Sequence, residues 1–169
     1  MDLHTVPQHE TLAPPEAQDA PSILIAAAEA IGMRAKRPTI TQAMILEAAQ
    51  KVADQIADLD AKTIADGYMY PMDVYQLMRE IDDYGDLAMS DVEELDAMDG
   101  IVTSLLLEAE KKWAAEHHMQ PPFPIGADIK QGVIVGFYEY RPACYRVKER
   151  GCTQDGRYLI VRFESAVAA

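Results

Sequence analysis

The sequence predicts an α+β protein in which a helical N-terminal part precedes an antiparallel β C-terminal part. Apolar residues recur at the 3.6-residue period of a helix between residues 41 and 117, whereas apolar and polar residues alternate as in a strand between residues 133 and 164. The stretch "HHMQPPFPIG" separates the two patterns, and proline does not continue a helix. We therefore expect a helical bundle over residues 21–120 and a small antiparallel β module over residues 121–169.

Length and composition are those of a globular protein with one domain, or one domain and a small added module. The chain has 169 residues, of which 49% are hydrophobic, so a core can form. Two cysteines, Cys144 and Cys152, are too few for a disulfide framework and are expected to be reduced thiols. No apolar run approaches the roughly 20 residues of a membrane span. We expect a cytoplasmic protein without a membrane partner.

The N-terminal segment has little packing pattern. Residues 1–20 contain three prolines and no hydrophobic period, which predicts a flexible tail. Ser22 is expected to cap a short helix over residues 23–31, and Gly32 to end it. The basic stretch "RAKRP" that follows is interpreted as a solvated linker.

The first two main helices are predicted from an apolar stripe and from their end signals. Thr41 is a suitable N-cap for a long helix reaching about residue 66, and Gly67 is expected to end it. Pro71 suits the first turn of a second helix, which Gly85 is expected to end. The stripe of the long helix has spacings of 4, 3, 4 and 3 and consists of Ile45, Ala49, Val52, Ile56 and Leu59.

The third main helix is predicted from the capping box "SDVE", with Ser90 at the cap, and is expected to run from about residue 91 to His117. At 100° per residue its apolar positions fall within an arc of about 100°, which indicates an amphipathic helix. They are Leu95, Met98, Val102, Leu105, Leu106, Ala109 and Trp113.

Three alternating segments, "VIVGFYEY", "ACYRVKE" and "RYLIVRFE", predict the strands of the β module. "RPA" and "RGCTQDG" are expected to form the turns, and "IGADIKQG" a short additional first strand. The face expected to be buried consists of Val133, Val135, Phe137, Tyr145, Val147, Leu159, Val161 and Phe163. A curled antiparallel sheet of this length resembles a small SH3-like barrel, which is a likeness of fold and implies no single function.

Negative charge is concentrated in the helical part. Residues 1–124 carry 23 acidic and 8 basic side chains, a net charge of −15, whereas residues 125–169 carry 5 acidic and 7 basic ones, a net charge of +2. The stretch "EIDDYGDLAMSDVEELDAMDG" holds nine carboxylates and no basic residue, but its spacing does not match a calcium-binding EF-hand loop. Taken singly, these carboxylates are explained by solvation and by the helix dipole.

Taken together, the carboxylates predict a non-enzymatic protein-binding protein whose acidic helical surface contacts a basic partner. A helical body about 35 Å long spans roughly 20 phosphate charges of duplex DNA, which is of the same order as the net charge. One specific form is an inhibitor that mimics nucleic acid, as anti-restriction and anti-CRISPR proteins of mobile elements do, an analogy of charge and size. The predicted contact residues are Asp86, Asp91, Glu93, Glu94, Asp96, Asp99, Glu108 and Glu110.

The outward face of the β module supports a different hypothesis. Aromatic and basic residues on one sheet surface can stack bases and hold phosphates, so a small nucleic-acid-binding or regulatory protein is the alternative. With a net charge of only +2, we rank docking of this face on acidic helices, of the same chain or of a second copy, above direct nucleic-acid binding. A structural subunit of a phage or plasmid assembly is a third hypothesis. The outward residues are Tyr138, Tyr140, Arg146, Lys148, Tyr158 and Arg162.

No motif indicates an enzyme, a metal site or a cofactor. The chain has no glycine-rich phosphate loop, no G-x-S-x-G and no H-E-x-x-H. His117 and His118 are adjacent and would point about 100° apart on a helix, so we interpret them as exposed helix-end residues. Cys144 is expected on the outward polar face, with no histidine near it in the sequence to activate it. We expect neither a catalytic residue nor a bound metal.

Overall fold

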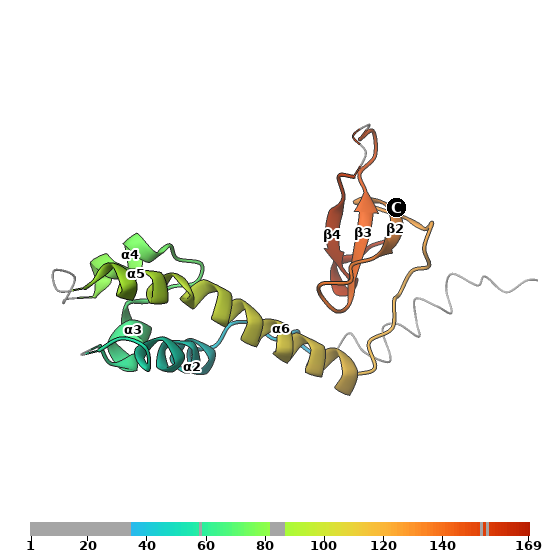
Figure 1. Ribbon diagram of the computed structural model, residues 1–169. Coiled ribbons are helices and arrows are strands. Elements are labelled where there is room, and N and C mark those ends of the chain that lie inside the picture. The colour runs from blue at the N-terminus through green and yellow to red at the C-terminus, as the bar shows by residue number, and fades with distance from the viewer. Residues whose placement is uncertain (1–34, 58, 82–86, 153, 155) are drawn as a thin grey trace, which may run out of the picture.

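The computed structural model describes residues 35–57, 59–81, 87–152, 154 and 156–169. Its helices are followed by a four-stranded antiparallel sheet, which confirms the predicted α+β class. The shorter helices gather beside the N-terminal half of the long helix α6, and the sheet lies near the other end of α6 (Figure 1). The tail at residues 1–20, the short helix at residues 23–31, and Gly85 with Asp86 lie outside the described residues.

The first predicted long helix is in fact two helices, α2 (Gln42–Ala53) and α3 (Ala61–Gly67). Thr41 caps α2 as predicted, since its hydroxyl accepts a hydrogen bond from the Met44 N–H at 3.3 Å. The prediction of one continuous helix is wrong because the Asp60 carboxylate caps a new helix, accepting from the N–H groups of Lys62 and Thr63. The predicted apolar stripe is nevertheless buried at all five positions.

The second predicted helix begins later than expected. The helix α4 (Val74–Glu80) has Asp73 as its N-cap, whose carboxylate accepts from the Gln76 N–H at 3.0 Å. Pro71 therefore precedes the helix instead of occupying its first turn, and that prediction is wrong. The side chain of Asp73 supplies the acceptor that the first turn requires, whereas proline supplies none.

The third predicted helix is also divided, into α5 (Met89–Asp96) and α6 (Met98–Glu116). The cap lies at Ala88 instead of Ser90, because the Asp91 carboxylate accepts a hydrogen bond from the Ala88 N–H at 2.8 Å. The predicted end near His117 is confirmed, since this residue is the C-cap of α6. Along the predicted stripe the buried positions are Leu95, Met98, Val102 and Trp113.

Four strands form the sheet in the order β1-β2-β3-β4, namely β1 (Asp128–Ile129), β2 (Gly132–Phe137), β3 (Cys144–Lys148) and β4 (Leu159–Arg162). A 3-10 turn, η2 (Phe163–Ser165), follows β4, and the chain then returns to β1, where the Lys130 N–H donates to the Val167 carbonyl at 2.9 Å. No described pairing joins β4 to β1, so the sheet is not a closed barrel.

A β-bulge in β2 changes which residues face the sheet core. The register with β3 shifts between Ile134 and Gly136, so Val135 is an extra residue in the strand. Ahead of the bulge Ile134 is buried and Val133 is exposed, so the predicted inward positions of Val133 and Val135 are wrong. A strict two-residue alternation cannot place residues on both sides of an inserted one. The prediction of burial is also wrong for Phe137 and Leu159, which are exposed at the ends of β2 and β4. The buried sheet core is Ile129, Ile134, Tyr145, Val147, Val161 and Phe163.

The helices and the sheet have separate hydrophobic cores. The helical core includes Leu77, Leu95 and Val102, and none of its residues belongs to the sheet core. The two parts are linked along the chain by the proline-rich junction, which Tyr145 holds against the sheet through two 2.9 Å hydrogen bonds to the main chain of Phe123. Within the described residues, no helix combines the length and apolar character needed to cross a bilayer.

Candidate functional sites

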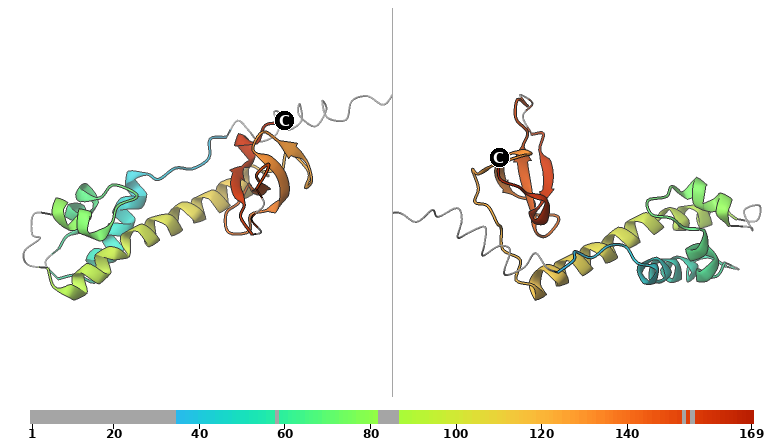
Figure 2. Two further views of the ribbon diagram at one scale, coloured as in Figure 1. Left: turned by 90° about the horizontal axis from the view of Figure 1, so that it is seen from above. Right: turned by 180° about the vertical axis from the view of Figure 1, so that it is seen from behind.

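Four charged side chains from four separate segments meet between the helices and the sheet, and we call them the ionic junction. Arg37 precedes α2, Glu110 lies on α6, Arg141 lies in the turn after β2, and Glu164 lies in η2. The segment that carries Arg37 runs beside α6 before it enters α2, as both views in Figure 2 show. Glu110 is fully buried and Arg37 is 7% exposed.

Two arginine–carboxylate pairs form the ionic junction. Arg37 donates from Nε and Nη2 to Glu164 at 2.5 and 3.1 Å, and Arg141 donates from Nε and Nη2 to Glu110 at 2.6 and 2.7 Å. Arg37 also donates to the carbonyl oxygens of Pro142 and Ala143 at 3.2 and 2.9 Å, and its Nη1 lies 3.5 Å from Glu110. Both pairs are bidentate, the geometry that gives the strongest charge-assisted hydrogen bonds.

Charge is retained in the ionic junction despite burial. Burial opposes the charge of Arg37, but the hydrogen bond and charge of Glu164 outweigh it and raise the pKa of Arg37. The hydrogen bond that Arg141 donates to Glu110 is the main cause that raises the pKa of Arg141. For Glu164 burial acts to raise the pKa, yet the hydrogen bond and charge of Arg37, a main-chain hydrogen bond and the charge of Arg162 together outweigh it and hold the pKa below its usual value. These three groups are therefore charged at neutral pH.

Glu110 does not belong to the acidic contact surface for which it was predicted. Its position outside the apolar arc predicted a solvated side chain, but Glu110 is fully buried and paired with Arg141 and Arg37. Periodicity along one helix identifies the face that meets the other helices. It does not identify a second face covered by a sheet from elsewhere in the chain.

The other predicted acidic residues divide into structural and exposed groups. Asp91 caps α5, and Asp99 accepts hydrogen bonds from the Tyr68 hydroxyl and the Met72 N–H. Burial first, and then Asp99, raises the pKa of Tyr68. Four carboxylates remain exposed without an ion pair to any described residue, and we call them the acidic face: Glu93, Glu94, Asp96 and Glu108.

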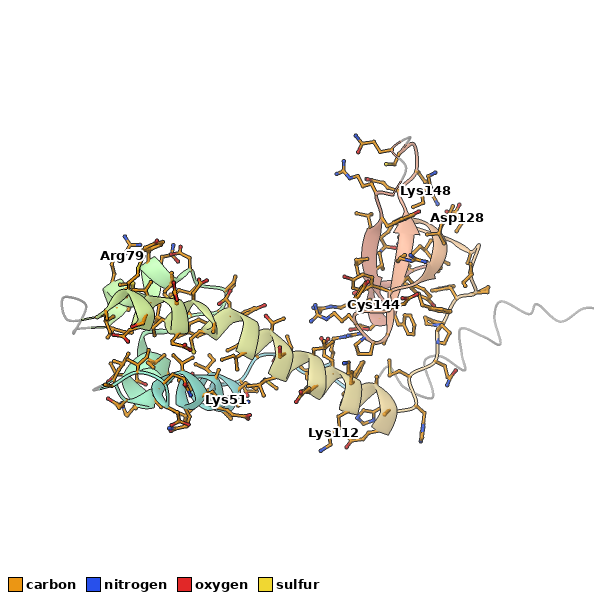
Figure 3. The ribbon with its side chains drawn as sticks, in the orientation of Figure 1. Lys51, Arg79, Lys112, Asp128, Cys144 and Lys148 are labelled. Carbon is orange, nitrogen blue, oxygen red and sulfur yellow. The ribbon has the colours of Figure 1, made fainter. Side chains whose placement is uncertain are left out.

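The predicted basic aromatic face is divided into two halves. Tyr138, Tyr140 and Arg162 line a groove of about 410 Å³ against α6, which we call the aromatic groove. The other half lies outside this groove and consists of Arg146, Lys148 and Tyr158, with the Arg146 guanidinium 5.8 Å from the centre of the Tyr158 ring. Figure 3 shows Lys148 at the end of the sheet far from α6 and Cys144 at the near end. Sequence alternation does not distinguish these halves.

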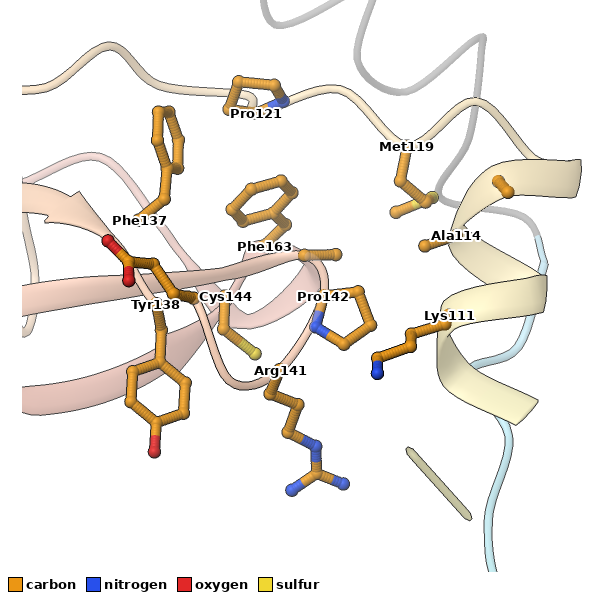
Figure 4. A pocket seen from close by; sticks show the side chains of 13 residues that line it. Lys111, Ala114, Met119, Pro121, Phe137, Tyr138, Arg141, Pro142, Cys144 and Phe163 are labelled. Atoms are coloured by element: carbon orange, nitrogen blue, oxygen red, sulfur yellow. The ribbon is translucent and has the colours of Figure 1, made fainter. Parts of the chain in front are cut away.

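An apolar cleft of about 570 Å³ lies between the C-terminal part of α6 and the sheet (Figure 4). Its lining includes Ala114, Met119, Phe137 and Phe163, with Arg141 and Tyr138 shared with the aromatic groove. The cleft and the groove therefore adjoin at Arg141 and Tyr138. Cleft walls of this composition favour apolar ligands, but they offer few polar groups that would orient one.

Cys144 also lines the apolar cleft, and its environment differs from the one predicted. It pairs with Arg162 across the strands, so it lies on the outward side of the sheet as expected. However, it is only 2% exposed, because the ionic junction covers this end of the sheet. Burial raises the pKa of the Cys144 thiol, although Arg37 and Arg141 act against the rise. The thiol is therefore neutral and buried near neutral pH, which does not suit a nucleophile.

Several residues of these sites carried no recognisable signal in the sequence. Arg37 lies in the stretch interpreted as a linker, and Glu164 ends a strand pattern.

Among the residues that the structure describes, no three histidine, cysteine or acidic side chains are grouped so that they could hold a metal ion. Comparison with protein-family models, with curated proteins and with solved structures gave no match.

Proposed function

We propose that the protein is a non-enzymatic binding protein whose acidic face contacts a basic partner in the cytoplasm. The observation that supports this function is the acidic face itself, four exposed carboxylates without an ion-pair partner among the described residues. Residues 87–110 contain seven carboxylates and no lysine or arginine. A field of one sign at a surface attracts the opposite sign and accelerates association.

One specific form of this function is occupation of a nucleic-acid-binding groove on the partner. The acidic face lies on consecutive helices, α5 and α6, so its charges follow a rod-like body instead of a flexible loop. Such a body suits a groove that otherwise holds a phosphate backbone. Glu110 does not take part, because the ionic junction neutralises it inside the molecule.

The experiment compares two variants with equal loss of charge. In the first, Glu93, Glu94, Asp96 and Glu108 are changed to the corresponding amides. In the matched control, the same change is made at four exposed carboxylates far along α6 or on the sheet, namely Glu116, Asp128, Glu139 and Glu149. A partner is first captured from the host lysate with wild-type protein, and association rates are then measured over a range of salt concentrations.

The acidic-face variant is expected to associate more slowly at low salt and to show a weaker salt dependence than the control. A nucleic-acid ligand of the partner should compete with the wild-type protein if the acidic face mimics nucleic acid. Equal association rates for both variants, with helix content unchanged, would show that the acidic face is only a solvated surface.

The remaining hypotheses from the sequence rest on weaker support. An SH3-like arrangement of the β module is proposed from the return of the C-terminal residues to β1, where Ala168 bridges Ile129. A structural subunit of a larger assembly has no specific feature in its favour. The alternative hypothesis, that the basic aromatic face of the β module binds nucleic acid, rests on the residues of this face that line the aromatic groove.

A further inference from the structure

We propose that the aromatic groove binds one nucleotide unit, a planar base that carries a phosphate group. This site lies on the sheet side of α6 and involves none of the four carboxylates of the acidic face. The inference is therefore independent of the function proposed above. The groove is lined by Tyr70, Thr103, Leu106, Leu107, Glu110, Tyr138, Tyr140, Arg141 and Arg162.

The rings that line the groove provide surfaces for stacking. Tyr140 is 76% exposed, and its ring lies against Tyr138 in an edge-to-face arrangement with 5.5 Å between centroids. Tyr70, which comes from the segment between α3 and α4, adds a third ring. Leu106 and Leu107 add apolar surface from α6. Bases stack on such rings with little regard to their identity, because every base has a π-face.

The charge of the groove suits an anion. Arg162 is exposed and forms no ion pair with any described residue. Arg141 uses Nε and Nη2 to hold Glu110. Glu110 is paired with Arg141, and Glu164, whose carboxyl also feels the charge of Arg162, is paired with Arg37. Three arginines thus face two carboxylates, which leaves one excess positive charge at Arg162. A guanidinium presents several N–H donors to the oxygens of a phosphate.

The dimensions favour a single unit over a long strand. A volume of about 410 Å³ lies in the range of pockets that enclose small ligands, roughly 300–1,000 Å³. The net charge of the protein, −13, opposes a polyanion, but this repulsion is screened beyond about 10 Å at 0.1 M salt. A strand should therefore be held by one of its nucleotides, with the rest in solvent.

An acidic peptide is the competing occupant, and the groove favours it less. Extended peptides bind mainly by adding a strand, through main-chain hydrogen bonds at a sheet edge. The Tyr138 N–H is already donated to the Cys144 carbonyl at 2.9 Å, so this main-chain donor of the groove is not free for a peptide. The groups that the groove offers to a ligand are tyrosine rings and the Arg162 guanidinium, which suit base stacking and phosphate binding.

The test uses the full-length protein and two nucleotide probes, fluorescein-labelled oligo(dT)8 followed by anisotropy and AMP followed by calorimetry. The groove variants are Tyr140→Ala and Arg162→Gln. The matched controls are Tyr158→Ala and Lys148→Gln, which make the same changes in ring and charge on the half of the sheet face outside the groove. Circular dichroism and the fluorescence of Trp113, the single tryptophan, verify folding.

Each groove variant is expected to weaken oligo(dT)8 binding by about tenfold or more, and the controls by less than about twofold. The logarithm of affinity should fall with the logarithm of salt at a slope of about −0.7 to −1.4, as for one or two phosphates. Binding of AMP with the same variant pattern would assign the site to free nucleotides as well, whereas binding of the oligonucleotide alone would assign it to strands.

Three results would overturn the proposal. The first is absence of binding of both nucleotide probes to the wild-type protein at low salt. The second is an equal loss in the control variants, which would move the site to the open sheet face. The third is binding of a glutamate-rich peptide with neither nucleotide probe bound. The acidic-face variant should bind oligo(dT)8 at least as well as wild type, which separates this outcome from the function proposed above.

Discussion

At the scale of single residues, Glu110 connects the helices to the sheet. It is a fully buried carboxylate on α6 whose two oxygens accept hydrogen bonds from Arg141, while Arg37 lies 3.5 Å away. Arg37 in turn lies 4.8 Å from the centre of the Trp113 ring, which adds a cation–π contact. A buried ion pair contributes little net stability compared with apolar packing, but loss of one partner leaves an uncompensated charge.

Glu110→Gln is expected to lower the free energy of unfolding by about 3 kcal/mol, because it leaves Arg141 and part of the Arg37 charge unmatched. Glu108→Gln is the matched control: it lies two residues away, is exposed, and should change stability by less than about 0.5 kcal/mol. Urea unfolding at pH 7 measures both. Equal effects of the two substitutions would contradict the assigned pairing of Glu110.

The lowered pKa of the Glu164 carboxyl predicts that the free energy of unfolding depends on pH. Its pKa is lowered in the folded state, so the unfolded state binds more protons as the pH falls through the acidic range. The stabilisation is therefore complete above the unfolded pKa of about 4.3 and is lost as the pH falls through the lower folded pKa. Urea unfolding of wild type and Glu164→Gln at pH 7 and at successively lower pH should give a shallower decline for the variant. Parallel declines would show that Glu164 is not the group responsible.

At the scale of elements, the two halves of α6 have different buried partners. Val102 and Met98 pack into the helical core, whereas Glu110 and Trp113 face the segment of Arg37 and the sheet. The N-terminal half of the helix thus stabilises the helical core, and the C-terminal half positions the sheet. This division explains how one element contributes to both the acidic face and the aromatic groove.

Val102→Asp is expected to unfold the helical part, because an unpaired carboxylate in an apolar core costs several kcal/mol. Ser104→Asp, at an exposed position on the same helix, serves as the control and should leave the melting temperature nearly unchanged. Thermal unfolding followed by circular dichroism distinguishes them. A wild-type melting temperature for Val102→Asp would mean that the buried face of α6 is assigned incorrectly.

Gly100 of α6 should be replaceable with a gain in stability. A Cβ atom at this helical position would meet nothing within 4 Å, and alanine is about 0.5–1 kcal/mol better than glycine inside a helix. Gly132→Ala should instead destabilise strongly, because φ is +139° and the added Cβ would lie 2.2 Å from the Lys148 carbonyl oxygen. Thermal melts of both variants check the contrast, and a loss of stability in Gly100→Ala would contradict it.

At the scale of the whole molecule, two hydrophobic cores are held together by a polar contact. The ionic junction links the segment before α2, α6 and the sheet, while each core packs its own residues. The acidic face lies on α5 and α6, and the aromatic groove lies where α6 meets the sheet. We therefore expect these few charged groups to fix the position of the two cores relative to each other.

Arg37→Gln is expected to loosen the arrangement of helices and sheet without unfolding either core. Small-angle X-ray scattering should show a larger radius of gyration, and amide exchange should accelerate around the turn after β2 more than inside the sheet. Lys36→Gln removes the same charge from the exposed neighbour and is the control. An unchanged radius in Arg37→Gln would show that the ionic junction does not hold the two parts together.

The sequence by itself determined the class of the protein, most of its strands and the buried stripe from Ile45 to Leu59, because periodic burial depends on neighbours within one element. The helix break at Asp60 interrupts the apolar period because its side-chain cap competes locally with a continuous helix. The break at Ala97 has no side-chain cap and leaves no such signal in the sequence. Only the tertiary structure decided that Glu110 is buried, that Cys144 is covered, and that Tyr140 and Arg162 line a groove. These outcomes depend on contacts between segments far apart in the chain, and such contacts leave no period in the sequence.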